Sequence, residues 1–322
     1  MKAIRIHAHG GHEAMQLETL PEPAPARGEA LVRIEASGVN FVEVYQRKGQ
    51  YAMTLPYTPG TEGAGTVLAV GEGVDTVRIG DRVVSQGFRG SYAELALAPA
   101  DRLVSIPAGV DTRIAAAAML QGLTAHYLTT STYDLRQGDW CLVHAAAGGV
   151  GLLLCQIARM RGAFAIGTVS TDEKARLAME AGATATINYT TQDFVAEVKR
   201  LTSGKGVPVV YDSVGATTFQ GSLNVLRPRG LMALFGQSSG PVPPFDPQLL
   251  NQKGSLFLTR PTLHHYVATR DELVARTTEL FRWIQEGKLK VRVHAEYSLA
   301  DAAKAHAALE SRGTTGKVIL VH

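Results

Sequence analysis

DWCLVHAAAGGVGLLLCQIA, residues 139–158, is the stretch that decides the fold. The apolar run 140–143 leads into a glycine-rich turn, after which apolar residues recur at helical spacing, so the stretch predicts a strand, a tight turn and a helix. The turn at 146–151 reads A-x-G-x-x-G. It is one residue short of the G-x-G-x-x-G fingerprint, in which amides at a helix start hold a pyrophosphate. A Gly-Gly pair alone could be a packing contact. The flanking strand and helix favour a dinucleotide site.

Beyond this stretch, short apolar runs and helical patterns alternate regularly. Such alternation builds a doubly wound parallel sheet (Rossmann), whose ligand crevice lies beyond the carboxyl ends of the strands. The expected strands are 140–144, 164–169, 185–188, 207–212, 230–235 and 255–259. The expected helices are 150–161, 172–181, 192–202 and 217–226.

The first hundred residues have a different character. Short β-like runs separated by turn residues predict an all-β, barrel-like domain. Residues 111–128 read as two helices separated by Gln121-Gly122, which we take as the domain junction. The last sixty residues do not extend the strand–helix alternation, and we assign them to the first domain. The predicted domains are therefore 1–122 with 262–322, and 123–261.

Composition narrows the function classes. A length of 322 residues favours two domains, and a formal charge of +3 gives no case for a nucleic-acid or membrane surface. No apolar run reaches 18 residues. The two cysteines, Cys141 and Cys155, can form neither a disulfide framework nor a multi-cysteine zinc site. We expect a globular protein of the reducing cytoplasm.

The position that selects the dinucleotide lacks an acid. A carboxylate about 20 residues beyond the fingerprint would hold the ribose hydroxyls of NAD. Ser170 stands there instead, followed by Thr171 and Lys174. Hydroxyls at a helix start with a cation nearby favour the 2′-phosphate of NADP. Ser170 with Glu173 could alternatively be a helix capping box.

Seven motifs distributed over most of the chain resemble one family. Together they resemble the zinc-independent quinone oxidoreductases, the zeta-crystallin-like branch of the medium-chain dehydrogenase/reductase superfamily. The motifs are NFVEVYQR (40–47), PGTEGAG (59–65), GDRV (80–83), QGLTA (121–125), HAAAGGVG (144–151), VYDSVG (210–215) and NQKGSL (251–256).

The resemblance implies a chaperonin-10-like β-barrel catalytic domain, a Rossmann cofactor domain and an active site in the cleft between them. It implies NADPH as the hydride donor and quinones or related α,β-unsaturated carbonyls as acceptors. It also implies a homodimer that pairs the last cofactor-domain strands near 255–259.

The resemblance further implies the residues of the site. Asn40 and Tyr45 would line the nicotinamide and substrate, with Thr124 and Tyr127 on the opposite wall. Tyr45 is the best candidate for a donor to the acceptor oxygen, although it could equally be a ring that forms the wall while water supplies the proton.

The remaining implied residues bind the cofactor. Phe235 and Leu258 could alternatively be ordinary buried strand residues. The pyrophosphate would contact Gly148, Gly149 and Val150, the 2′-phosphate would contact Ser170 and Lys174, and the adenine or its ribose would contact Tyr189. The crevice would be lined by Val214, Phe235, Gly236 and Ser238. The nicotinamide half would lie near Leu258, Arg260 and Lys317.

No metal site is expected. Zinc members of the superfamily carry a cysteine and a histidine where this chain has Asn40 and Thr61, and the structural zinc lobe is absent.

Two other functions stay open: an NADPH-dependent enone or alkenal reductase, which would differ only in the pocket lining, and a crystallin-like structural or RNA-binding role. RNA binding would need a basic, aromatic surface that the charge balance does not indicate.

Overall fold

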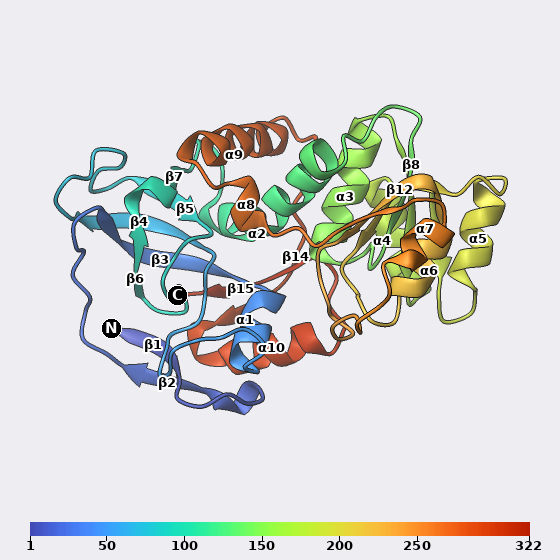
Figure 1. Cartoon of the computed structure of the whole chain (residues 1–322). Helices are drawn as coiled ribbons and strands as arrows, with labels where there is room; N and C mark the ends of the chain where they lie inside the picture. The colour runs from blue at the N-terminus through green and yellow to red at the C-terminus, as the bar shows by residue number, and fades with distance from the viewer. The chain divides into compact units, whose positions relative to one another are not determined.

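The computed structural model describes all residues 1–322, which divide into two compact units (Figure 1). Residues 262–268 and 287–290 group with the second unit, whereas the sequence-based boundary placed them in the first. The first unit comprises Met1–Gln121, Thr269–Glu286 and Val291–His322, and the second Gly122–Ala268 and Gly287–Lys290.

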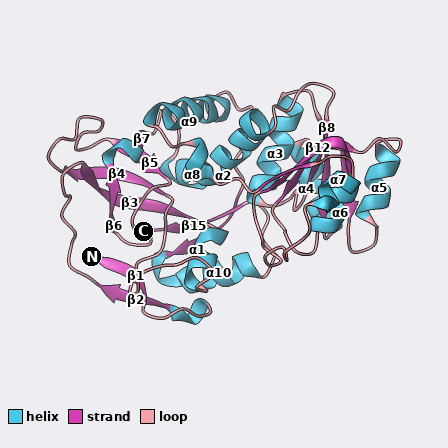
Figure 2. Cartoon of the chain, viewed as in Figure 1, coloured by secondary structure: helices cyan, strands magenta, loops and turns pink.

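The second unit is built on a six-stranded sheet in which every neighbouring pair is parallel. Figure 2 distinguishes the strands (magenta) from the helices (cyan). The strand order is β10-β9-β8-β11-β12-β13, so the order reverses between β8 and β11. In doubly wound sheets this switch point is where ligands bind. The strands are β8 (Trp140–Val143), β9 (Phe164–Val169), β10 (Ala185–Asn188), β11 (Val207–Asp212), β12 (Leu226–Leu234) and β13 (Phe257–Thr259).

Four helices, α3 to α6, connect these strands as the alternating pattern predicts, whereas α7 between β12 and β13 and α8 after β13 were not predicted. Their residue ranges are α3 (Gly149–Met160), α4 (Asp172–Ala181), α5 (Phe194–Leu201), α6 (Phe219–Asn224), α7 (Gln248–Gln252) and α8 (Leu263–Tyr266).

The glycine-rich turn permits a close approach between α3 and the end of β8. Ala145 has a positive φ of 51°, which turns the chain sharply after the strand. A Cβ on Gly151 would lie 2.3 Å from the Ala145 carbonyl oxygen and 2.7 Å from the Ala146 Cα. Only glycine fits there, which is the packing role of the third glycine in dinucleotide-binding turns.

The first unit contains a seven-stranded sheet, mostly antiparallel, and a separate β1-β2 pair. Strand β3 is central, because it pairs with β15, β4 and β6. The strands are β1 (Lys2–Ile6), β2 (Met15–Thr19), β3 (Glu29–Val39), β4 (Gly63–Val70), β5 (Arg82–Ser85), β6 (Leu95–Pro99), β7 (Val104–Ser105), β14 (Val293–Ser298) and β15 (Lys317–Val321).

Three helices belong to the first unit, and a fourth, α2, runs through the residue at which the two units divide. They are α1 (Phe41–Arg47), α9 (Arg270–Gln285), α10 (Ala302–Glu310) and α2 (Thr112–Tyr127). Short 3₁₀ turns span His12–Ala14, Ala100–Arg102 and Leu299–Asp301, and a π-helical turn, Leu128–Thr132, follows α2.

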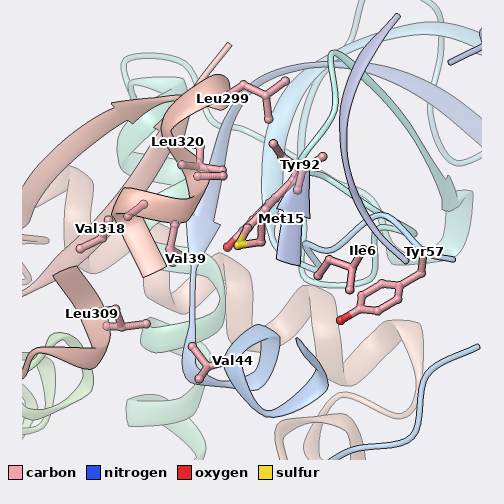
Figure 3. Packing of buried hydrophobic residues seen from close by; sticks show 13 residues of the cluster. Ile6, Met15, Val39, Val44, Tyr57, Tyr92, Leu299, Leu309, Val318 and Leu320 are labelled. Atoms are coloured by element: carbon pink, nitrogen blue, oxygen red, sulfur yellow. The ribbon is translucent and has the colours of Figure 1, made fainter. Parts of the chain in front are cut away.

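An apolar cluster joins the end of the chain to its beginning (Figure 3). Val318 and Leu320 of β15 pack with Val39 of β3, and α1 and α10 contribute Val44 and Leu309. All five are buried. This burial is the reason why the last thirty residues belong to the first unit.

The expected break between two helices at Gln121-Gly122 is wrong, although the two units divide between these two residues. Helix α2 continues through Gly122 to Tyr127. A glycine inside a helix costs about 1 kcal/mol relative to alanine. Burial of the apolar residues on both sides, including Met119 and Leu123, outweighs that cost.

Candidate active site

The cofactor end of the second unit begins at α3. Gly148 is its N-cap, and no acidic residue lies in the first turn. The free amides at the start of a twelve-residue helix therefore face no competing negative charge and are available to an anion. The predicted pyrophosphate residues Gly148, Gly149 and Val150 lie together at this helix start.

A buried carboxylate fixes the loop after β11. Asp212 Oδ1 accepts the backbone N–H groups of Val214 at 2.8 Å and Gly215 at 3.1 Å. The Asp212 carbonyl accepts the N–H of Phe235 at 2.8 Å, and Ser238 N–H donates to the Ser213 carbonyl at 3.2 Å. The loops after β11 and β12 are thus tied together, which brings Val214, Phe235 and Ser238 to one edge of the sheet.

Gly236 lies at the same edge of the sheet, at a position where no side chain would fit. A Cβ on Gly236 would lie 2.6 Å from the carbonyl oxygen of Ser213. The backbone of the β12 loop can therefore approach the β11 loop closely.

His144, at the end of β8, joins this network. Its Nδ1 lies 2.9 Å from Thr168 Oγ1 and its Nε2 lies 3.0 Å from Ser222 Oγ, which in turn donates to Asp212 Oδ2 at 2.8 Å. Burial lowers the pKa of His144, and the nearby Asp212 opposes that shift. The neutral imidazole cross-links β8, β9, α6 and β11 at the switch point.

The proposed phosphate selectors Ser170 and Lys174 are brought together. Lys174 Nζ donates to Ser170 Oγ at 3.1 Å, at the start of α4. The helix cap is Thr171, whose Oγ1 accepts the Lys174 N–H at 3.2 Å, so capping does not explain Ser170. Tyr189 follows β10, is bonded through its N–H to the Val169 carbonyl, and has 50% of its surface exposed.

Tyr127 and Thr124 lie on the last turn of α2 and are both buried. The Tyr127 ring stacks on Tyr266, with ring centroids 4.1 Å apart. Burial raises the pKa of Tyr127, with Tyr266 adding to the shift.

Arg260 Nη1 donates to the Leu234 carbonyl at 3.1 Å, which ties the chain after β13 to the end of β12. Leu258, within β13, is half-buried against the apolar core of this unit.

In the first unit, Asn40 stands in a buried ionic cluster at the start of α1. Lys317 Nζ donates to Asn40 Oδ1 and to Glu62 Oε2, each at 2.5 Å. Asn40 Nδ2 donates to the same Glu62 oxygen at 2.9 Å. The side chains of Lys317 and Glu62 have no exposed surface. Lys317, predicted near the nicotinamide, is thus engaged by two neighbours of the same unit.

A second carboxylate, Glu43, lies beside this cluster. It accepts the Asn40 N–H at 3.0 Å and both the N–H and the hydroxyl of Thr61, at 3.1 and 2.9 Å. Burial raises the pKa of Glu43 from 4.5 to about 7, which outweighs the lowering by Thr61 and Lys317. The fully buried carboxyl therefore exchanges its proton near neutrality.

The Tyr45 ring contacts two other aromatic rings. Its centroid lies 5.4 Å from Tyr51 in an edge arrangement and 6.1 Å from Phe41. Its ring keeps 9% of its surface exposed. Asn40 and Tyr45 thus occupy the N-cap and the second turn of one short helix, α1, so whatever orients the start of α1 also orients Tyr45.

A doubly wound dinucleotide fold together with an antiparallel β-domain defines the medium-chain dehydrogenase/reductase class. Family models agree with this class. Residues 26–108 match the alcohol dehydrogenase GroES-like domain, and residues 149–284 match the domain described as zinc-binding dehydrogenase.

Individual relatives narrow the family. The chain is 46% identical to a quinone oxidoreductase of Pseudomonas aeruginosa, with 99% of each chain covered. It is 40% identical to a 2-haloacrylate reductase of a Burkholderia species, covering 99% of this chain and 98% of that one. The structure of Escherichia coli quinone oxidoreductase complexed with NADPH superposes with a TM-score of 0.98 at 45% identity, covering 100% of both chains. The chain belongs to the quinone oxidoreductase family of this superfamily.

One family description implies zinc, but the residues of this chain do not fit that metal. Zinc in proteins is bound by thiolate, imidazole and carboxylate ligands. The positions that carry cysteine and histidine in zinc members are Asn40 and Thr61, and the ammonium of Lys317 already lies against Asn40 and Glu62. The structure contains no group of three His, Cys, Asp or Glu side chains placed to hold a metal. None of its helices has the length and apolarity of a membrane span.

Sequence reasoning missed the buried acids and the histidine. Glu43 and Glu62 lie inside the two motifs that we quoted, but nothing local distinguishes a buried carboxylate from an exposed one. Asp212 and His144 likewise ended predicted strands without a signal that they would meet. For Glu62 and His144 the missing signal is tertiary, because their partners Lys317 and Ser222 lie 255 and 78 residues away.

The raised pKa of Glu43 predicts a pH-dependent stability. Between pH 4.5 and 7 the folded chain keeps a proton that the unfolded chain releases, so this group's contribution to stability falls as pH rises through that window. The change is roughly 3 kcal/mol. The charge that acts on Glu43 is that of Lys317.

Replacing Glu43 by Gln removes this titration. Urea unfolding at pH 5, 6, 7 and 8 should show Glu43→Gln gaining stability over the parent protein as pH rises. Parallel stability curves for the two proteins would contradict the assignment.

Proposed function

We propose that this chain transfers a hydride from NADPH to quinones, without a metal. The reaction type is supported by membership of the quinone oxidoreductase family. The choice of NADPH as cofactor is supported by one observation: Ser170 and Lys174 lie in contact at the position where NAD enzymes have the acid that binds the ribose. The NADPH complex of the E. coli relative supports the same cofactor.

The residues of this chain perform the binding and orientation. The amides of Gly149 and Val150 at the start of α3 hold the pyrophosphate, Ser170 and Lys174 hold the 2′-phosphate, and Tyr189 lies against the adenine end. Val214, Phe235, Gly236 and Ser238 shape the crevice at the sheet edge that Asp212 fixes. Thr124, Tyr127, Leu258 and Arg260 belong to the walls around the reactive end.

The chemistry demands little of the protein beyond placement. When bound, NADPH supplies the hydride, which the quinone accepts together with one proton to give the quinol. Quinones are electrophilic enough to need only a hydrogen-bond donor at the oxygen that gains charge. We assign that donor role to Tyr45, which the α1 geometry holds firmly.

A second reaction, reduction of an α,β-unsaturated carbonyl compound such as an enone or alkenal, has one comparison in its favour, a relative named for a related α,β-unsaturated carboxylate. The Burkholderia relative is a 2-haloacrylate reductase and is 40% identical over nearly the whole chain. Both reactions use the same cofactor residues and differ only in the acceptor.

Cofactor choice tests the proposal directly. The parent protein should oxidise NADPH with para- or ortho-quinones and bind NADPH more tightly than NADH. Lys174→Ala should raise the Kd for NADPH about tenfold, because a charge-assisted hydrogen bond is lost, and should leave the Kd for NADH unchanged. Arg176→Ala, on the same helix and paired with Glu180, is the control and should change neither. Equal affinities of the parent protein for NADPH and NADH would exclude the 2′-phosphate site.

Tyr45→Phe separates the donor role from a wall role. Loss of the hydroxyl should lower kcat for a quinone about 100-fold, the range of a general acid, with the Kd for NADPH unchanged. Stopped-flow fluorescence measures both. An unaltered kcat would leave Tyr45 as a ring in the wall, with water as the proton source.

We further propose a homodimer in the cytoplasm. Strand β13 is the edge of the parallel sheet, and Phe257 on it is 60% exposed. An open apolar edge is suited to pairing with the same edge of a second copy. Light scattering should give twice the chain mass, and Phe257→Asp should shift the protein towards monomer. A monomeric parent protein would reject the dimer.

A further inference from the structure

The carboxyl of Glu43 has no exposed surface, yet one of its partners can carry a proton to and from it. Its Oε2 accepts the backbone N–H of Asn40 at 3.0 Å. Its Oε1 accepts the backbone N–H of Thr61 at 3.1 Å and the Thr61 hydroxyl at 2.9 Å. A backbone N–H only donates, whereas a hydroxyl both donates and accepts. The Thr61 hydroxyl is therefore the partner that can relay a proton.

The turn before β4 holds the Thr61 side chain against this carboxyl. Gly60 has a φ of 101°, and a Cβ there would lie 2.4 Å from Ser91 Oγ, so the turn is packed tightly. Thr61 is half-buried, whereas Glu43 is fully buried. The Thr61 side chain thus connects the buried carboxyl to the accessible surface. It does so at the first turn of α1, the helix that carries the proposed hydrogen-bond donor Tyr45.

Helix capping alone does not account for this arrangement. Glu43 belongs to the capping box of α1, a role that requires only an acceptor for the Asn40 N–H. Glutamine fills that role as well as glutamate does, and an ionisable group is costly to bury. The two hydrogen bonds from Thr61 to Oε1 lie outside the capping box. An acid at this position therefore calls for a second role.

The neighbouring groups that titrate do not compete with Glu43 as acids. Burial raises the pKa of Glu43 to about 7, an effect opposed by Thr61 and by the ammonium of Lys317. Burial also raises the pKa of Tyr57 to about 12 and holds the pKa of Tyr92 well above its usual value, and the charge of Glu43 adds to both shifts. Near neutrality Glu43 is the member of this set that can release a proton and take it back.

The direction of the hydrogen bond between Thr61 and Glu43 depends on that proton. An ionised carboxylate can only accept, so the Thr61 hydroxyl then donates to Oε1. A protonated Oε1 donates to Thr61 Oγ1 instead, and the Thr61 hydrogen becomes available to an acceptor outside. The two states differ in the positions of hydrogens and need no movement of heavier atoms.

We propose that Glu43 supplies the proton of quinol formation and that the Thr61 hydroxyl passes it to the oxygen of the reduced quinone. The inference rests on the proposed function, which supplies the hydride. A quinone that has accepted a hydride carries a negative oxygen of phenolate type, which takes up a proton near neutrality because phenols have a pKa of about 10. Tyr45 stabilises the same oxygen by a hydrogen bond and keeps its own proton.

The transfer balances within these groups. The Thr61 O–H bond breaks as its hydrogen bonds to the quinone oxygen, and the Glu43 proton moves to Thr61 Oγ1. The products are the quinol and an ionised Glu43, to which the Thr61 hydroxyl again donates. Solvent returns a proton to Glu43 by the same route after the quinol leaves.

Removing the hydroxyl tests the relay. With NADPH bound and para-benzoquinone added in a stopped-flow instrument, the single-turnover rate of the parent protein should be constant below pH 7 and fall about tenfold for each pH unit above it, because ionised Glu43 has no proton to give. Thr61→Val keeps the backbone N–H to Glu43 but cannot pass a proton. Its rate at pH 6 should be about 100-fold lower and should not fall above pH 7, with the Kd for NADPH unchanged.

Three further variants separate a relay from a structural role. Thr61→Ser keeps a hydroxyl and should recover most of the rate together with its fall above pH 7. Glu43→Gln removes the acid and should lose the pH dependence, as Thr61→Val does. Thr66→Val is the control, because it breaks another bond from a hydroxyl to a carboxylate in the same unit, to Glu35 at 2.9 Å. It should keep the rate and the pH profile of the parent protein.

Each outcome decides one part. A Thr61→Val rate equal to that of the parent protein overturns the relay. A slow Thr61→Val whose rate still falls above pH 7 also overturns it, because Thr61 would then only position other groups. A parent rate that does not change between pH 6 and 9 overturns the role of Glu43. A parent protein that oxidises NADPH with no quinone refutes the proposed function and the relay with it, whereas the other failures leave the proposed function standing.

Discussion

The buried contact between the Lys317 ammonium and the Glu62 carboxylate is the constraint on which the first unit depends. A charge without a partner in a protein interior is strongly destabilising, so the two residues must be brought together for the chain to fold. They are 255 residues apart in sequence, and Lys317 is 277 residues from Asn40. The contact therefore requires β15 to pair with β3, which explains why the end of the chain completes the unit that its beginning starts.

The second unit also contains a buried carboxylate, but hydrogen-bond donors without charge stabilise it there. Its central carboxylate, Asp212, accepts hydrogen bonds from backbone amides and hydroxyls, and burial favours the neutral form of its neighbour His144. A set of neutral donors holds two loops at the switch point without adding net charge. We propose that the cation that binds the cofactor's phosphate is Lys174, in the first turn of α4.

The sequence predicted what depends on local pattern. The alternation of apolar runs placed β9 at 164–169 and α4 at 172–181 as the structure has them. The absent ribose acid pointed to Ser170 and Lys174, which the structure places in contact. The break at Gln121-Gly122 was wrong because burial outweighed the propensity of one glycine. The ionic cluster could not be predicted, since Lys317 opens an ordinary strand and Glu62 directly precedes one, and they acquire their roles only through long-range pairing.

Hydride transfer positioned by the chain's own charges, without a metal, is tested most directly by a single-turnover measurement. Protein dialysed against a strong chelator would be mixed with NADPH and a quinone in a stopped-flow instrument, with bound metals quantified by mass spectrometry on the same sample. We predict an unchanged rate of NADPH oxidation at substoichiometric metal content. Loss of that rate, restored by one equivalent of zinc, would contradict the assignment.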